Sequence, residues 1–506
     1  MTHEWLAEIA ALVGAAGSAL VLLGGARRVL LVAGFALLVV AEAGLAVALL
    51  PTNDLERLLS SAGVAALIAC GLFAVAGTWA FVRWPATVPV ALLLAAPFRI
   101  PVELGSQDAF LLLPLYVVLA AASLALIYRT IRGEELAAIP LWLAGPAAAF
   151  VGWASLSMLW ALDPEQGAIL LLFFLFPFAA LLAVVARSPF ASWLPGALAS
   201  SLIGLAIVFA VIGLYQAWTH TLVFAQDLRV ANAYTTYFRV TSLFKDPSIY
   251  GRQLVLALSL LVVVLWVGRI RPRHAVPLAA VLFAGLYFSY SQSSLVVLFA
   301  TVLVASLLLA DTRSRNAVAA VAVAVALAAG ALAVASAMDD GLSRATAGRS
   351  RLLSVTTTVI TNHPVAGVGI GSQPLASTRE VGTRKRVVKN ASHTTPLTVL
   401  AELGAVGFVL YVAFLAGAAK ALWEAFRRHR NFGLGLTICY LVLFLHSLFY
   451  AGFFEEPVMW GILGAASLVV ATAPAALGAR AAEREEPVST APDTSLLGRV
   501  EARWHT

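Results

Sequence analysis

Fifteen apolar stretches of 14 to 25 residues follow one another along this chain of 506 residues, and they limit what it can fold into. An α-helix needs roughly 20 apolar residues to cross the hydrocarbon core of a bilayer. Because lipid offers the backbone no hydrogen-bond partners, only helices and closed barrels can span it. We therefore predict an all-α polytopic membrane protein with about 15 transmembrane helices. The predicted spans are 5–24, 29–50, 58–82, 85–98, 108–128, 138–161, 166–186, 194–218, 248–268, 275–290, 293–310, 316–337, 395–419, 433–452 and 456–476.

Composition supports this reading of the apolar stretches. Of all residues 61% are apolar and only 12% are charged, and the mean hydropathy is +0.92, which no soluble domain approaches. The two cysteines, Cys70 and Cys439, fall inside apolar stretches and are interpreted as packing residues without a disulfide. The first stretch lacks a basic leading region and a clear cleavage site, so it is predicted to be a retained span.

Basic residues in the short loops indicate the orientation of the chain. With the N-terminus outside, the inner short loops carry fifteen Lys or Arg residues and the outer ones carry only Arg57 and Arg99. This asymmetry is what the positive-inside rule requires. The chain is therefore expected to be a multi-pass membrane protein with its C-terminus inside. Loops 219–247 and 338–394 then lie on the outer face, and the polar segment 477–506 forms a disordered cytoplasmic tail.

The loop 338–394 carries an unusual charge for the outer face. It contains eight Lys or Arg residues against Asp339, Asp340 and Glu380, a net charge of +5. One interpretation is a merely solvated basic loop, because long loops cross membranes largely regardless of charge. The other is a site for an anion on the outer face, such as a lipid phosphate, a diphosphate or an acidic glycan.

A histidine ends this basic loop at the mouth of an apolar helix. His393 lies four residues after Lys389 and directly precedes a helix whose expected N-cap is Thr394 or Thr395, with Pro396 in the first turn. A lone histidine near a membrane surface is usually structural. Neutral imidazole is also the commonest general base near neutral pH, so His393 is a candidate catalytic residue.

A second group of charges lies in the segment YFRVTSLFKDPSIYGRQL. Arg239 is either an exposed loop residue or an anion contact, and Lys245 and Asp246 lead from it into a span. Arg252 stands about one turn inside that span, where a cation is costly and normally faces a partner or a wet cavity. Its alternative is to extend its head group to the membrane surface.

The segment 348–372 supplies a third candidate. Residues 349–362 are predicted to form a short helix that Arg349 opens, where the arginine holds a phosphate or is simply solvated. The following GVGIG is not a dinucleotide-binding fingerprint, because no strand precedes it and no βαβ unit surrounds it. We interpret it as a sharp reversal with close backbone packing.

Some catalytic signatures are missing from the sequence. It contains no Asp-x-Asp, no HExxH, no P-loop and no Cys/His metal spacing. We therefore expect no metal and no cofactor, and no nucleic-acid partner. A metal-dependent nucleotide-sugar transferase is thus disfavoured. If the protein used a diphosphate-linked sugar donor, arginine and lysine would have to neutralise the diphosphate instead.

Together these motifs resemble the O-antigen ligase and O-antigen polymerase superfamily of membrane glycosyltransferases. The similarity runs in order from about residue 85 to 475. Arg239–Ser248 resembles the family's arginine followed by Gly-x-Phe-x-Asn-Pro-Asn, and Arg349 with His363–Gly369 resembles its HP-x-x-G-x-G block. His393–Leu397 with Glu402–Gly407 resembles its histidine and E-x-G-x-x-G block. The resemblance implies a family-like membrane domain over 85–476, preceded by three extra N-terminal helices over 1–84.

The chain also departs from the family pattern. The family often has Thr-x-Ser-Arg at the outer end of a middle span, where this sequence has Ser289-Tyr-Ser291-Gln292-Ser293, so Gln292 replaces a phosphate-binding arginine. Ser242 stands where glycine is usual, and Asp246 stands for asparagine. Arg252 or Lys245 is a hypothetical source of the missing charge.

The resemblance implies a protein of the cytoplasmic (inner) membrane with its active site on the outer, periplasmic face. It would transfer a glycan from a polyprenyl-diphosphate carrier to a hydroxyl acceptor, without a metal and with inversion. The acceptor is a glycan or a lipid, and ligase and polymerase remain open. Arg239 and Arg349, with Lys245, Arg252 and Gln292 as further candidates, would bind the diphosphate, and His393 would be the base. Glu402 would orient a helix or a basic partner. The alternative is a transporter or flippase for the same lipid-linked glycan, which would need cations along a path open to both faces.

Overall fold

The computed structural model describes residues 3–25, 27–50, 60–104, 107–224, 228–229, 232, 237–309, 349–380, 392 and 394–472, with the backbone alone at 62, 66–67, 100–104, 107–111 and 349–351. The residues outside this description include His393, the predicted span 316–337, the predicted tail 477–506, and residues 338–348 and 381–391 of the basic loop. Their predicted roles stay predictions.

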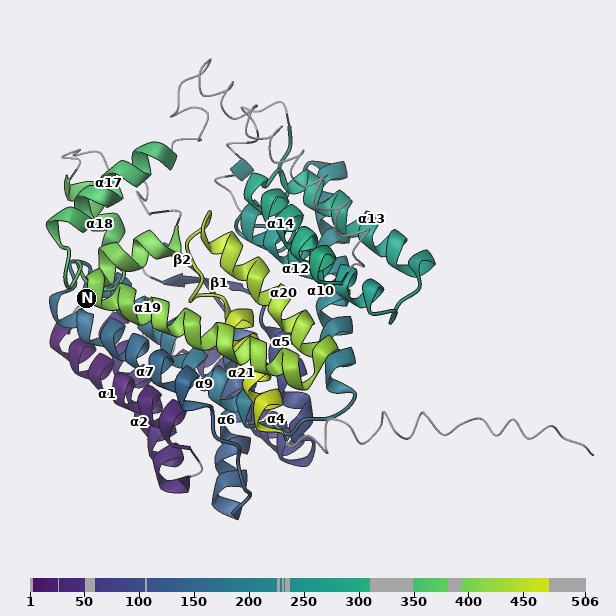
Figure 1. Cartoon of the computed structure of the whole chain (residues 1–506). Helices are drawn as coiled ribbons and strands as arrows, with labels where there is room; N and C mark the ends of the chain where they lie inside the picture. Colours follow the sequence, from purple (N-terminus) through teal and green to yellow (C-terminus); the bar gives the residue numbers. More distant parts are fainter. Residues whose placement is uncertain are drawn as a thin grey trace, which may run out of the picture. The chain divides into compact units, whose positions relative to one another are not determined.

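The described chain consists of helices and one short hairpin (Figure 1). The helices are α1 (Glu4–Leu23), α2 (Arg28–Leu49), α4 (Ser61–Arg83), α5 (Val88–Ala95), α6 (Leu113–Arg132), α7 (Leu141–Leu156), α8 (Pro164–Leu170), α9 (Phe176–Ala186), α10 (Leu194–Thr219), α12 (Pro247–Trp266), α13 (Pro272–Ser289), α14 (Gln292–Leu309), α17 (Arg349–Asn362), α18 (Gln373–Glu380), α19 (Thr395–Arg428), α20 (Arg430–Ser447) and α21 (Pro457–Ala471). Short 3-10 turns cover Pro85–Thr87 and Ser157–Trp160, and a π-helical turn, Leu171–Leu175, joins α8 to α9.

Ten of the described helices are long and apolar enough to cross a membrane, so the protein is a multi-pass membrane protein but the count of fifteen is not confirmed. Four more predicted spans correspond to α5, α13, α20 and α21. As described, these helices are too short or not apolar enough to be counted with the ten. The fifteenth, 316–337, is outside the described residues.

The described fold is helical apart from one short hairpin, and this hairpin corrects the start of the predicted span 108–128. Strands β1 (Ile100–Leu104) and β2 (Gln107–Leu111) pair antiparallel, and α6 begins only at Leu113. In the sequence the two strands are separated by Gly-Ser, and a two-residue connection that begins with glycine is typical of hairpins. Polar residues within both strands also break the apolar run that a span requires.

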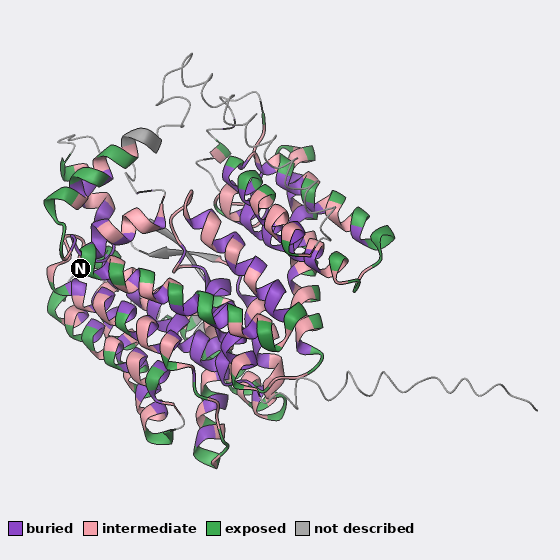
Figure 2. Cartoon of the chain, viewed as in Figure 1, coloured by how far each residue is buried: buried purple, intermediate pink, exposed green. Residues whose placement is uncertain are grey.

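The tightest packing surrounds α9. All eleven residues of α9 are buried, as are most of α21 and α12 (Figure 2). Helix α1 packs on α2, α7 and α9, so the N-terminal helices are joined to the rest of the bundle.

Helix α19 is broken inside its apolar stretch. Gly404 has φ 64° and ψ −166°, a conformation that is essentially restricted to glycine. Non-helical backbone at membrane depth is tolerated only where protein or a wet cavity satisfies its polar groups. Helices α17 and α18 pack on the first part of α19, before this break (Figure 1).

The glycine-rich segment 364–371 supplies the missing hydrogen bonds. The amides of Val368 and Gly369 donate to the carbonyls of Ala401 and Glu402, at 3.0 and 2.8 Å. In return the Ala405 amide donates to the Pro364 carbonyl at 2.9 Å. The two family-like blocks HPVAGVG and ELGAVG therefore form one structural unit.

Glycines permit this close approach. A Cβ atom added at Gly367 would lie 2.3 Å from the carbonyl oxygen of Glu402, and one at Gly404 would lie 2.2 Å from that of Val365. Gly367, Gly369 and Gly371 all have positive φ, which confirms the predicted sharp reversal with close backbone packing. The same segment also contacts the residues around α8, because Ser157 Oγ accepts from the Ile370 amide and Ser372 Oγ accepts from the Asp163 amide, both at 3.0 Å.

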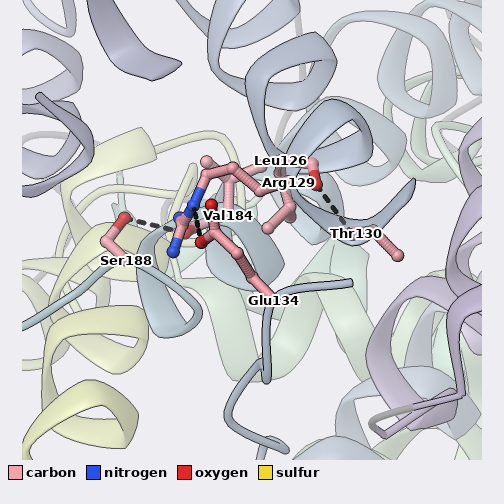
Figure 3. A network of polar contacts seen from close by, with 6 residues as sticks. All are labelled: Leu126, Arg129, Thr130, Glu134, Val184 and Ser188. Carbon is pink, nitrogen blue, oxygen red and sulfur yellow. Dashed lines mark hydrogen bonds and ion pairs between the residues drawn. The ribbon is translucent and has the colours of Figure 1, made fainter. Parts of the chain in front are cut away.

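The contacts divide the loops into two sets, as alternating spans require. In one set, the Arg28 guanidinium donates to the Gly133 carbonyl at 3.0 Å, and the rings of Phe190 and His429 lie 5.9 Å apart. Figure 3 shows a third contact of this set, the Arg129–Glu134 salt bridge of 2.6 Å near the end of α9. All these loops are predicted to face the cytoplasm.

The other set gathers the loops that are predicted to lie outside. The Val240 amide donates to the Phe288 carbonyl at 3.2 Å, and Arg252 pairs with Glu456. Contacts thus agree with the predicted alternation, while the face each set occupies stays a prediction.

We predict that Gly404→Ala destabilises the protein. Alanine would adopt an unfavourable backbone conformation that costs about 1–3 kcal/mol, and its Cβ would collide with the Val365 carbonyl. Thermal unfolding in detergent should show a clearly lower Tm. The control is Gly204→Ala in α10, where a Cβ meets open space and the Tm should stay equal or rise. Equal Tm values for wild type and Gly404→Ala would contradict the role of the break.

Candidate functional site

The site begins at the turn that precedes α12. Gln216, buried in α10, holds this turn with three hydrogen bonds. Its Oε1 accepts from the amides of Thr241 and Ser242, at 3.2 and 2.8 Å, and its Nε2 donates to the Ser242 carbonyl at 2.8 Å. Gln216 was missed in the sequence, where a single amide in a predicted span is the only signal.

Ser242 explains one departure from the family pattern. Its φ is +54°, in the left-handed region that glycine adopts without cost. The glycine that is usual at this position of the family motif would fit the turn without strain. The Ser242 hydroxyl is buried, and within the described chain it has no hydrogen-bond partner.

Arg239 belongs to the segment before α12, and its side chain contacts the turn between α13 and α14. Its Nε donates to the Ser289 carbonyl at 3.4 Å, and the Asn232 side chain bonds both its amide and its carbonyl. Gln292 is exposed as the first residue of α14, three residues beyond Ser289. The structure therefore brings Arg239 to the turn that Gln292 follows.

Lys245 and Asp246 take different places at the start of α12. Lys245 is exposed, whereas Asp246 is half-buried and caps the helix, because its Oδ1 accepts from the Ser248 amide at 2.6 Å. The carboxylate of Asp246 thus has a structural role at an N-terminus.

Arg252 is buried and paired. Its side chain is 6% exposed, and its Nη2 donates to the carboxylate of Glu456, whose side chain is 3% exposed. The alternative in which Arg252 extends to the membrane surface is therefore wrong. Its Nε is buried and has no hydrogen-bond partner among the described residues.

The partner of Arg252 identifies a part of the site that was missed in the sequence, the turn of residues 448–456 between α20 and α21. The Trp460 indole donates to the Phe454 carbonyl at 3.0 Å, and the rings of Phe454 and Phe150 stack at 4.3 Å. These contacts fix the turn that carries Glu455 and Glu456. The signal in the sequence was the Glu-Glu pair directly before a predicted span.

Glu455, next to Glu456 in this turn, is a titratable group with charged neighbours. Burial raises the pKa of its carboxyl above the usual range, and the positive charges of Arg99 and Arg252 oppose that rise. Arg99, which follows α5, is half-buried. Within the described chain no hydrogen bond or ion pair of its guanidinium or of the Glu455 carboxyl is found.

A second chain of contacts runs from the break in α19 toward His393. The carboxylate of Glu402 accepts from the Gln373 amide at 3.3 Å, at the start of α18. Gln373 Oε1 in turn accepts from the amide of Ser392 at 2.9 Å, and its Nε2 donates to Ser377 Oγ at 2.8 Å. Glu402 therefore bonds the start of α18, and Gln373 holds the residue that precedes His393. Arg349 opens α17 as predicted, with its backbone alone described.

A buried serine cluster underlies the turn between α13 and α14. Ser291 Oγ lies 2.8 Å from Ser294 Oγ, which lies 3.5 Å from Nε2 of His446 in α20. A Cβ atom added at Gly251 would lie 2.5 Å from Ser294 Oγ, so the residue next to Arg252 packs against this cluster. The cluster connects the Arg239 side of the site with the Arg252 side.

Fold and site together define a polytopic helical membrane protein with cations and carboxylates gathered at one end of its helices. A sequence model of the O-antigen ligase family matches residues 277–412. This match confirms the predicted resemblance to the O-antigen ligase and polymerase superfamily, a family of glycan-transferring membrane proteins in polysaccharide biosynthesis. The matched segment contains the glycine-rich unit and the break in α19 but not the Arg239 block. No curated protein matches the chain.

We predict that Ser242→Gly stabilises the protein. It removes a left-handed backbone strain of about 1–2 kcal/mol and a buried unpaired hydroxyl, and the added flexibility of the unfolded chain offsets part of the gain. Ser242→Ala removes the hydroxyl and keeps the strain, so it serves as the control. Thermal unfolding should give the highest Tm for the glycine variant, and a Tm below that of Ser242→Ala would refute the strain.

Proposed function

We propose that the protein transfers a glycan from a polyprenyl-diphosphate carrier to a hydroxyl acceptor on the outer face of the cytoplasmic membrane. One observation carries the proposal. The segment around Arg239, the start of α12 and the 448–456 turn lie at the same end of the helices, linked by the contacts of Arg239 with Ser289 and of Arg252 with Glu456. This arrangement supports binding of a diphosphate close to the lipid, because guanidinium groups bind phosphate oxygens with several donors.

In this proposal the cations bind the diphosphate and stabilise its charge as it leaves. Arg239 and Arg349 contact it directly, Lys245 approaches from the exposed side, and Gln292 donates from its amide at the start of α14. Arg252, held by Glu456, contributes its unpaired Nε.

His393 is proposed to take the proton of the acceptor. The acceptor oxygen forms a bond to the anomeric carbon, and the bond from that carbon to the diphosphate breaks with its electron pair left on the polyprenyl diphosphate. The acceptor proton passes to the imidazole. A single displacement of this kind inverts the anomeric configuration and requires no metal. Support comes from Ser392, whose amide is fixed by Gln373 directly before His393.

Purified protein should form new glycan linkages when it is incubated with a lipid-linked oligosaccharide and an acceptor. His393→Ala should lower turnover by about 10²–10⁴ with nearly unchanged donor binding, since a base acts in the chemical step. His274→Ala, in the exposed first turn of α13, is the control and should keep full turnover.

Two results would contradict this assignment. Weak donor binding with normal turnover of bound donor would make His393 a phosphate contact. Movement of the lipid-linked glycan across vesicle membranes without any new linkage would favour the transporter instead.

Cysteine labelling should test the face of the site. In a background with Cys70 and Cys439 replaced, Lys245→Cys should react with an impermeant maleimide in intact cells. Arg428→Cys, exposed at the end of α19, should react only after permeabilisation. The opposite pattern would overturn the orientation and the outer-face transfer together.

A further inference from the structure

Arg99 and Glu455 have no role in the proposed transfer so far, yet they lie within its site. The two side chains interact electrostatically. Each is partly accessible, and each lacks a hydrogen bond or ion pair among the described residues. Unpaired charged groups in a half-buried place are costly unless a ligand completes them.

The charged and titratable groups that act electrostatically around Glu455 belong to several elements of the fold. They are Arg99 after α5, Arg252 in α12, Glu402 in α19, and Glu456 and Tyr450 on its own turn, with Asp246 close to Tyr450. The carboxylate of Glu456 already occupies one end of the Arg252 guanidinium. Among these cations, Arg99 therefore remains without an ion pair in the described part of the chain.

A second observation points to a ligand here. Arg252 is 5% exposed and still leaves its Nε without a partner in the described structure. The place thus offers unpaired guanidinium donors from Arg99 and Arg252. A phosphate group accepts from such donors, but it repels an ionised carboxylate at the same place.

A neutral carboxyl removes this conflict, because it donates a hydrogen bond. Burial favours the neutral form, since it raises the pKa of Glu455. A bound diphosphate would favour it further through its negative charge.

We propose that Glu455 is a protonated ligand of the donor diphosphate, which donates a hydrogen bond to a phosphate oxygen while Arg99 supplies the charge that Gln292 does not. This inference rests on the proposed function and adds two residues to its donor site. Neither residue lies in the segment matched by the family model.

The proposal makes donor binding depend on pH in a defined direction. Below the pKa of Glu455 in the free protein, the proton is already present and binding is insensitive to it. Above that pKa, binding must take up a proton, so affinity falls by up to about tenfold for each pH unit. The amide of glutamine donates a hydrogen bond at every pH, so Glu455→Gln should remove this pH dependence of donor binding.

The experiment measures binding of a short-chain prenyl diphosphate to the purified full-length protein by calorimetry between pH 5.5 and 9. We expect a steeper loss of affinity at high pH in wild type than in Glu455→Gln, because titration of the probe itself is common to both. Glu424→Gln, at the far end of α19, should behave as wild type. Arg99→Ala should weaken binding about ten- to a hundredfold at low pH.

Each result decides a different claim. Identical pH dependence in wild type and Glu455→Gln would overturn the role of Glu455 alone. Unchanged affinity but lost turnover in Glu455→Gln would make it a base and overturn its role as a ligand. No binding of the probe to wild type at any pH would overturn the diphosphate donor and this inference with it.

Discussion

The break in α19 is the constraint on which the rest of the site depends. A helix interrupted at membrane depth leaves amides and carbonyls that lipid cannot satisfy. The segment 364–371 satisfies them with its own backbone, and it can come close enough only because Gly367 and Gly404 lack side chains. Once this unit has formed, the position of α18 follows, and through Gln373 so does that of Ser392, directly before the proposed base.

Charge balance is the second principle of the site. Arg252 and Glu456 are both almost fully buried, and a pair of this kind contributes little net stability because desolvation offsets the attraction. Its value lies in holding a guanidinium at a fixed place on α12 with one nitrogen unpaired. The neighbouring Arg99 and Glu455 have no such mutual bond, so they remain available for a substrate.

The sequence predicted the membrane class, most helices and the pairing of loops by face, because apolar length and basic residues report directly on the bilayer. It also predicted the tight reversal at GVGIG. It could not predict the hairpin at 100–111, since Val102 and Phe110 are apolar in a strand as well as in a span. Nor could it predict that Glu456 pairs with Arg252, because 204 positions separate them and only the packing of α12 against the end of α20 brings them together.

The departures from the family motif take on a physical meaning in the fold. Ser242 keeps the left-handed turn that glycine would form without strain, and Gln216 holds that turn with three hydrogen bonds, so the geometry of the Arg239 block survives the substitution. Gln292 keeps a hydrogen-bond donor at the start of α14 but gives up a positive charge. A site that must bind a diphosphate needs that charge from elsewhere. Lys245 is exposed and Arg252 is already paired with Glu456. Arg99, which acts electrostatically on Glu455 and has no ion pair in the described part of the chain, is the cation that we expect to supply the charge.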